Sequence, residues 1–308
     1  ARPGCSAAGG SPARKPLLKK NFAAIVALLV APFALPQQMH AQDNYDMKII
    51  GTRVTSHNCN DLSTIDGVSG TVKFDPTTNT LTLDNATMKT IVPECVGLET
   101  LIKDLTINLV GNNSITSESY WGLFNDKNCK ITIKGSGKLV VNGAMSVSQE
   151  GFRRAIFNWG TIVVDGCDLE ACGGVYGLGS GYWKFVNCNV RAKGGGGSNR
   201  DAYAGSITWV WDTAPELVGC KVTAPAGAYW TSFENNKHIN YVLVDAEGKV
   251  VTDWVEITCD NTSISTPDID TAVAKHSIYT TQGLRCAGEL KDQPAGIYIV
   301  DGKKVAKP

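Results

Sequence analysis

A short phrase recurs through the middle of the chain: an alternating apolar strand, a small or polar turn, and a second alternating strand. Its clearest copies are TIVVDGCDLEA, YWKFVNCNVRA and PELVGCKVTA, with turns centred on Cys167, Cys188 and Cys220. Looser copies follow the same pattern at intervals of 21 to 32 residues and are centred on Ala86, Asn112 and Ser136. Units of this length cannot bury their apolar faces alone and stack on one another. The pattern therefore predicts an all-β solenoid.

Superposing the three clearest copies predicts which side chains meet, because strands alternate faces and successive coils pair in parallel. Cys167, Cys188 and Cys220 form an inward column in which Cys serves as a small apolar filler. The next inward columns are Leu169, Val190 and Val222, and then Ala171, Ala192 and Ala224. In an outward column, Glu170 lies opposite Arg191 as a complementary charge pair.

The segments that flank the repeat show different patterns. The strand MKIIGTRVTS and the hairpin GTVKFDPTTNTLTLDNATM, with its turn at DPTTN, precede the repeat. After it, YVLVDAEGKVV predicts a hairpin and TSISTPDIDT reads as a linker. The predicted parts are an N-terminal cap with the first coil (42–97), the rungs (98–236), a closing hairpin (237–262), and a linker with a short C-terminal β segment (263–308).

Residues 1–41 differ from the rest in composition. They hold five of the 29 basic residues and no acidic residue, and the apolar run FAAIVALLVAPFALP follows the basic segment. This run is too short and too interrupted by Pro for a membrane span, so it predicts a secretory signal peptide cleaved after Ala41. Gln42 stands where a lipoprotein would carry Cys. We therefore expect an exported mature chain with neither a lipid anchor nor a transmembrane segment.

Charge and cysteine content narrow the classes of function. Beyond residue 41 the chain has 24 basic and 29 acidic residues, and this balance disfavours nucleic-acid binding. Nine cysteines lie there, an odd number with no Cys-x-x-Cys pair, which argues against a disulfide framework and against structural zinc. The three histidines of this part all lie outside the repeat, so no Ser or Cys nucleophile has a base at a recognisable spacing.

The interval from Cys188 to Cys220 is eleven residues longer than the one before it, and the extra length lies in the loop GGGGSNRDAYAGS. Insertions in solenoids form loops that often carry the binding face. Trp and Tyr rings stack on the flat C–H faces of sugars. The predicted polysaccharide site consists of Arg200, Asp201, Tyr203, Trp209 and Trp211. Trp209 and Trp211 are expected on one strand face, and the alternative for this pair is a packing role.

Three acidic residues cluster around one turn of the repeat: Asp165, Asp168 and Glu170. Carboxylates are preferred calcium ligands, and two of them at a suitable separation could also form a glycosidase pair. The alternative is that all three are solvated turn residues. Calcium is therefore the one cofactor that the sequence suggests.

Residues 47–225 resemble bacterial secreted proteins described as carbohydrate-binding domain-containing, through MKIIGTRVTS, GTVKFDPTTNTLTLDNATM, LTINLVGNNSI and ITIKGSGKLVVNG. The resemblance implies a right-handed parallel β-helix, a polysaccharide ligand and often calcium, and it carries over no ligand residue. The end of the chain, IYTTQGLR and PAGIYIVDGKKVAK, resembles a short type IX secretion sorting signal. The matching positions are Gly296, Tyr298, Val300, Gly302 and Lys303. This likeness implies export by outer-membrane secretion machinery to the surface or medium of a Gram-negative cell.

The sequence thus predicts an exported right-handed parallel β-helix, with an N-terminal strand and hairpin cap and a short C-terminal β segment, that binds polysaccharide without turning it over. One alternative is a β-helix polysaccharide lyase or glycosidase. A lyase needs a basic residue to abstract a proton, and the candidates, which no spacing distinguishes, are Arg153, Arg154, Lys184, Arg191 and Arg200. The other alternative is a structural surface protein or adhesin without a sugar site.

Overall fold

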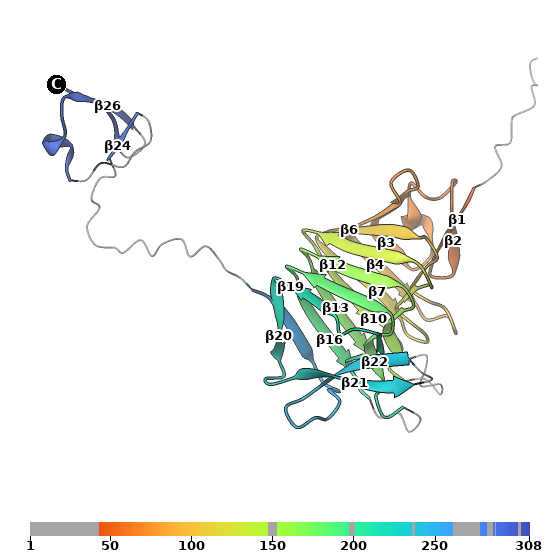
Figure 1. The fold of residues 1–308 in the computed structure, drawn as a ribbon. Helices are drawn as coiled ribbons and strands as arrows, with labels where there is room; N and C mark the ends of the chain where they lie inside the picture. Colours follow the sequence, from red (N-terminus) through yellow and green to blue (C-terminus); the bar gives the residue numbers. More distant parts are fainter. Residues whose placement is uncertain are drawn as a thin grey trace, which may run out of the picture.

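The computed structural model describes residues 43–146, 153–196, 201–235, 238–260, 278–281, 286, 288–300 and 303–308. Within these ranges the chain is all-β, with two short 3-10 turns and no α-helix (Figure 1). The predicted signal peptide and most of the predicted linker lie outside the described residues. The prediction of an all-β, solenoid-like fold is confirmed.

Three ladders of parallel strands run through the central part of the chain. The first contains β5 (Leu98–Thr100), β8 (Leu123–Asn125), β11 (Arg154–Asn158), β14 (Tyr176–Gly179) and β17 (Ile207–Thr208). The second contains β6 (Asp104–Val110), β9 (Lys130–Gly135), β12 (Thr161–Asp165), β15 (Tyr182–Val186) and β19 (Glu216–Val218). The third contains β7 (Asn112–Ser117), β10 (Lys138–Asn142), β13 (Asp168–Gly173) and β16 (Asn189–Gly194). Consecutive strands enter the three ladders in turn, so each set of three forms one coil.

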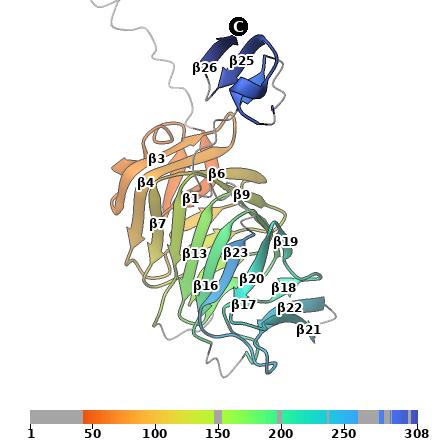
Figure 2. The same cartoon turned by 90° about the vertical axis from the view of Figure 1, so that its left-hand side faces the viewer.

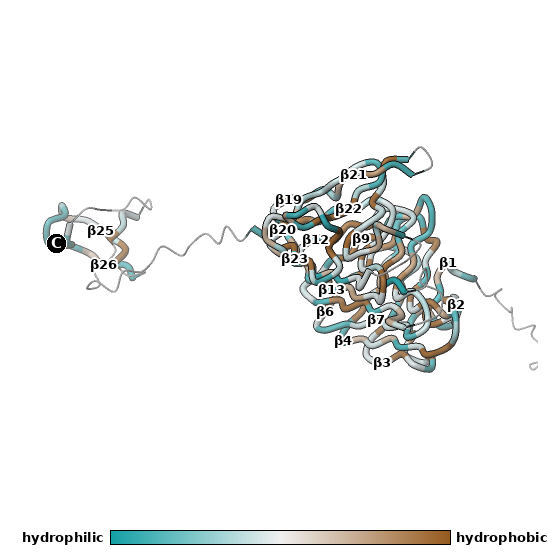
Figure 3. Tube along the Cα trace, turned by 90° about the horizontal axis from the view of Figure 1, so that it is seen from below, coloured by the Kyte–Doolittle hydropathy of each residue, from teal (hydrophilic) through white to brown (hydrophobic). Residues whose placement is uncertain are grey.

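Alternate side chains of each strand are buried in the interior of the coils. The hydropathy of the backbone trace shows apolar positions that recur along the strands (Figure 3). One inward column of the second ladder consists of Leu105, Ile131, Ile162 and Trp183, all buried. The matching column of the third ladder becomes smaller from coil to coil: Ile115, Val141, Ala171 and Ala192. The largest side chain of one wall thus shares a coil with Ala on another wall, which keeps the interior filled.

The predicted register of the two closest copies is confirmed. Leu169 pairs with Val190 and Ala171 with Ala192 across β13 and β16. Cys167, Cys188 and Cys220 are buried, as expected for inward packing residues. Burial raises the pKa of the Cys167 thiol to about 12, so this side chain stays neutral at physiological pH.

The predicted direct pairing of the strands that follow Cys188 and Cys220 is wrong, because another strand lies between them, whereas the two thiols themselves lie close together, as the predicted column requires. β23 (Val255–Cys259) inserts antiparallel between β16 and β20 (Cys220–Ala224), as Figure 2 shows. Ile257 of β23 is the partner of both Val190 and Val222, so these two valines do not meet. β23 comes from a segment after the repeat, and its sequence does not show the repeated strand–turn–strand pattern.

The two looser copies centred on Asn112 and Ser136 do not align uniformly with Cys167. The registers of β7, β10 and β13 extend to place Cys167 level with Gly111 and Gly137. The register of β9 and β12 extends to place Cys167 level with Ser136, the predicted centre. The turns contain different numbers of small residues, which hides the true alignment from a comparison of letters alone.

The N-terminal cap ends the stack with antiparallel strands. β1 (Asn44–Ile49) pairs with β5 and with β2 (Thr52–Thr55), and the 3-10 turn η2 (Leu62–Thr64) follows. β3 (Val68–Asp75) and β4 (Thr80–Thr90) form the predicted hairpin, in which the Asp75 side chain accepts a hydrogen bond from the amide of Thr77 (2.9 Å). β4 pairs with β6 through its first half and with β7 through its second, so it joins the second and third ladders into one sheet.

Residues on both sides of the last copy of the repeat form a small sheet of their own. β18 (Val210–Trp211), β22 (His238–Val244) and β21 (Tyr229–Asn235) pair antiparallel in that order. In the hairpin predicted within 237–262, the two arms are joined by one antiparallel β-bridge, between Val244 and Val250. The first arm, β22, pairs along its whole length with β21 instead. At the C-terminus, β24 (Ile278–Thr280), β25 (Gly296–Val300) and β26 (Lys303–Lys307) form a separate antiparallel unit, with the 3-10 turn η4 (Leu290–Asp292).

Candidate functional site

Asp201 is the centre of the predicted polysaccharide site. Its carboxylate accepts hydrogen bonds from the Tyr176 hydroxyl (2.8 Å), the Trp209 indole nitrogen (2.6 Å) and the backbone amide of Tyr203 (2.8 Å). Tyr176 belongs to β14, one coil earlier, so this carboxylate ties the inserted loop to the preceding coil. Such charge-assisted hydrogen bonds are stronger than neutral ones, and Asp201 therefore positions its neighbours.

Two of these rings meet Phe233 of β21. Tyr203 stacks on Phe233 with ring centroids 3.6 Å apart and planes at 6°, and Trp209 meets Phe233 edge-on at 4.9 Å. We call Tyr176, Asp201, Tyr203, Trp209 and Phe233 the Asp201 cluster. Three members, Asp201, Tyr203 and Trp209, were predicted from the sequence to lie together, and the structure confirms their contact. Arg200, predicted beside them, lies outside the described residues.

Trp209 and Trp211 do not share a strand face, contrary to expectation. Trp209 lies between β17 and β18 with a φ of 57°, in the left-handed region that non-glycine residues seldom adopt. The chain leaves the first ladder at this residue and joins the three-stranded sheet. The ring of Trp209 consequently packs in the Asp201 cluster, while Trp211 packs edge-on against Tyr182 (centroids 6.0 Å apart).

Trp211 is one of three aromatic residues that lie near the corner between the first and second ladders on successive coils. Trp159 occupies this corner between β11 and β12, Tyr182 begins β15 after the next corner, and Trp211 precedes β19 on the following coil. Trp159 is 42% exposed and Tyr182 40% exposed. The Tyr182 hydroxyl donates to Asp212 (2.6 Å), and this hydrogen bond is the main cause of its raised pKa. We call Trp159, Tyr182 and Trp211 the aromatic corner.

A second set of rings backs this corner on the outer face of the first ladder. Phe124 and Phe157 are partners in β8 and β11, with centroids 5.6 Å apart, and both contact Trp159 at 5.8 and 5.2 Å. Trp121 contacts the same two phenylalanines at 5.2 and 4.6 Å. Edge-to-face and tilted arrangements of this kind stabilise aromatic clusters. Trp159 is therefore held in place by rings while part of it faces solvent.

Arg154 connects the two aromatic groups. Its guanidinium lies over the rings of Phe157 (4.2 Å) and Tyr176 (4.3 Å). Burial lowers the pKa of Arg154, an effect that the nearby Tyr176 and Asp201 oppose. Guanidinium groups stay protonated in proteins, so Arg154 brings a positive charge near the Asp201 carboxylate.

Three other basic residues considered for a lyase, all within the described part of the chain, are bound to neighbouring groups. Arg153 donates to the carbonyls of Met145 and Gly174, and Lys184 pairs with Glu216 at 2.8 Å. Arg191 contacts Glu170 and Glu256 and lies over Trp254. No observation singles out one of these bases for proton abstraction.

The three acidic residues predicted as calcium ligands are not gathered around one point. Asp165 ends β12 and is exposed, while Asp168 begins β13 and accepts a hydrogen bond from Asn189 (3.0 Å). Glu170 is held by Lys138 (2.8 Å) and by its predicted partner Arg191 (3.3 Å). Within the described ranges, no three His, Cys, Asp or Glu side chains come together as a metal-binding group.

The ion pairs of Glu170 predict a pH dependence of stability. Its hydrogen bond from Lys138 is the main reason that the pKa of Glu170 lies below the ordinary value of 4.5. A carboxyl group with a lowered folded-state pKa stabilises the fold above its unfolded pKa, and this contribution is lost as the pH falls through the folded pKa. We expect the free energy of unfolding to fall less steeply below pH 4.5 in Glu170→Gln than in wild type. Urea denaturation across this range measures both slopes, and equal slopes would contradict the assignment.

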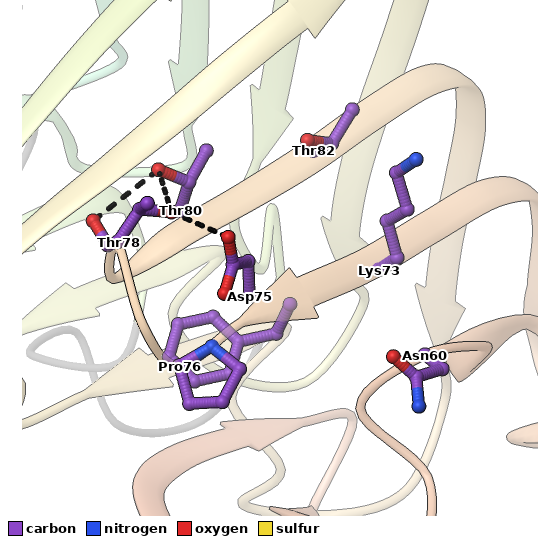
Figure 4. A pocket seen from close by; sticks show the side chains of 8 residues that line it. Asn60, Lys73, Asp75, Pro76, Thr78, Thr80 and Thr82 are labelled. Carbon is purple, nitrogen blue, oxygen red and sulfur yellow. Dashed lines mark hydrogen bonds between the residues drawn. The ribbon is translucent and has the colours of Figure 1, made fainter.

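A polar hollow of about 330 Å³ lies elsewhere, along the hairpin of β3 and β4 (Figure 4). Its lining includes Lys73, Asp75 and several threonines, and the Thr78 hydroxyl donates to Asp75 (2.9 Å). It contains none of the residues that the sequence singled out for binding. The aromatic corner and the Asp201 cluster therefore remain the better candidate site.

No protein family, curated protein or solved structure matches this chain. The site must accordingly be interpreted from its own chemistry. No helix among the described residues has the length and apolarity needed to span a membrane.

Several residues of the site escaped the sequence analysis. Phe233 and Tyr176 lie about 30 and 25 residues from their partners along the chain and have no motif that links them to Asp201. Trp159 and Tyr182 carried a usable signal, since each stands next to the glycine turn that begins the second-ladder strand of its coil. The register of β12 and β15 pairs Tyr182 with Thr161, so the two rings occupy different positions at the corner.

Proposed function

We propose that this chain is an exported, non-catalytic polysaccharide-binding protein built on a right-handed parallel β-helix, and that the sugar lies along the aromatic corner. Parallel crossover connections are right-handed in about 98% of cases, which supports the handedness. Export rests on the signal-like residues 1–41 and on the C-terminal resemblance to a sorting signal. Outer-membrane secretion machinery and a cell-surface or extracellular location belong to the same proposal.

The aromatic corner is the single observation that supports the sugar ligand best. Its residues come from successive coils, whose strands lie about 4.8 Å apart, and the rings of Tyr182 and Trp211 contact each other. Rings on neighbouring coils can contact more than one unit of an extended sugar chain, and each stacked ring adds apolar contact with C–H groups. Exposed Tyr203 of the Asp201 cluster offers a further contact.

Polar groups next to the rings suit hydroxyl-rich ligands. Asp212 lies within hydrogen-bonding distance of the Tyr182 hydroxyl, and its carboxylate has further acceptor capacity. Asp201, in contrast, already accepts three hydrogen bonds from protein groups. We therefore assign direct contact to the aromatic corner with Asp212 and Tyr203, and a positioning role to Asp201 and Trp209.

Binding to insoluble polysaccharides tests the proposal. We expect wild type to sediment with at least one of a panel of neutral and acidic polysaccharides, and the double variant Trp159→Ala, Trp211→Ala to lose at least tenfold in affinity. A tenfold loss corresponds to about 1.4 kcal/mol, which removal of two stacking rings readily supplies. Failure of wild type to bind any polysaccharide would overturn the proposal.

Trp254→Ala provides the matched control. Trp254 is a half-buried tryptophan of the segment before β23, where it packs under Arg191 rather than at the corner. We expect this variant to bind as wild type does. Equal losses in Trp254→Ala and in the double variant would show that the corner has no special part in binding.

A further inference from the structure

Three thiols lie near one another where the stack of coils ends. Cys188 precedes β16, Cys220 begins β20, and Cys259 ends β23. Cys188 and Cys220 are buried, and Cys259 is partly buried. Cys259 comes from beyond the repeat, so the regular spacing of cysteines along the coils does not account for it.

Cys220 and Cys259 face each other directly across two antiparallel strands. They are Cα partners in the register of β20 and β23. The amide of Asp260 donates to the carbonyl of Gly219 (2.8 Å), one residue outside the pair on each strand. This bond makes Cys220 and Cys259 a non-hydrogen-bonded pair, the type in which Cα atoms approach to about 4.5 Å and side chains lie closest. A disulfide requires Cα atoms about 4.4–6.8 Å apart.

Both side chains also lie on the same face of the sheet. Cys220 is two residues before Val222 and Cys259 two residues after Ile257, and Val222 and Ile257 are themselves partners. Since side chains alternate along a strand, both cysteines share the inward face with these residues. The contact of Cys259 with β16 is less regular, because its amide donates to the Asn189 side chain (3.1 Å) instead of to a backbone carbonyl.

We propose that Cys220 and Cys259 form a disulfide under oxidising conditions and thereby lock the closing strand β23 to the last copy of the repeat. Two S–H bonds break and one S–S bond forms, and the two electrons and two protons pass to a disulfide-containing oxidant by thiol–disulfide exchange. The bridge closes a loop that contains β21 and β22, and with them Phe233 of the Asp201 cluster. The inference rests on strand register and is independent of polysaccharide binding.

Mapping of disulfides in the full chain tests this pairing. The protein is equilibrated with oxidised and reduced glutathione, quenched with acid, alkylated in denaturant, and digested without reduction for mass spectrometry. We expect a peptide pair that joins Cys220 to Cys259, with Cys188 alkylated. Alkylation of both Cys220 and Cys259 would overturn the proposal, and so would a bridge between Cys188 and Cys220.

Thermal unfolding gives a second, independent measurement. Closing a loop of this length restricts the unfolded chain, so oxidation is expected to raise the Tm of wild type by about 5–10 °C. Cys259→Ala should lose this redox-dependent shift, whereas Cys188→Ala should keep it. A shift of equal size in Cys259→Ala would contradict the pairing, and the peptide map of wild type stands even if a variant fails to fold.

Discussion

Replacing Trp183 with alanine is expected to lower the free energy of unfolding by about 3–5 kcal/mol, the range for removal of a large buried aromatic side chain. Trp183 is only 3% exposed, stacks on Phe185 with centroids 5.9 Å apart, and donates its indole N–H to the Ser180 carbonyl (2.7 Å). The matching position on the third-ladder wall of this coil is Ala192, whose side chain is too small to fill the space left by the ring.

Urea denaturation followed by circular dichroism measures this loss. Trp183→Phe should recover part of the stability because it restores much of the ring volume. Trp254→Ala removes a half-buried tryptophan from an outer surface and should cost about 1 kcal/mol. A loss in Trp183→Ala no greater than that in Trp254→Ala would show that the interior does not depend on this ring.

Gly143→Ala should destabilise the chain by about 3 kcal/mol or more, through overpacking of backbone against backbone. Gly143 is buried just after β10, and a Cβ atom there would overlap the carbonyl group of Arg154 at the start of β11. Backbone cannot move aside as a flexible side chain can. The variant would also displace Arg154, which lies between Phe157 and Tyr176.

Gly166→Asn is the matched control for this prediction. Gly166 has a φ of 64°, and a Cβ atom there would meet nothing within 4 Å. The equivalent residue of the next coil is Asn187, with a φ of 44°. Asn tolerates this left-handed region better than most residues, so we expect a change of about 0.5 kcal/mol. Thermal unfolding of both variants compares them, and a larger loss in Gly166→Asn would contradict the steric explanation.

The repeat could be predicted from sequence because strand alternation and turn chemistry are local. They sufficed for the inward cysteines and for the partners Leu169 with Val190 and Glu170 with Arg191. Position in the stack is a nonlocal property, and there the prediction failed. β23 enters between β16 and β20 from a segment without the repeat, and its hydrophobic alternation fits any sheet.

In the candidate site, too, local features could be predicted from the sequence and nonlocal ones could not. The stretched interval after Cys188 pointed to Asp201, Tyr203 and Trp209, which the structure brings together. Trp211 is separated from Trp209 because Trp209 itself has a left-handed backbone conformation. The sequence SITWVWDT contains no feature that predicts a positive φ at this tryptophan. Backbone conformations of this kind are imposed by tertiary packing and must be seen in the structure.

The antiparallel strands at the two ends of the stack limit how the protein can change in length. β1 covers the first ladder at one end, and β23 covers the third ladder at the other. A strand added outside β1 in the first ladder, or outside β23 in the third, would find no parallel partner, whereas a coil inserted between existing coils would meet matching ladders on both sides. Gain or loss of coils during evolution is therefore expected in the interior of the array, where it would lengthen or shorten the aromatic corner while both ends stay the same.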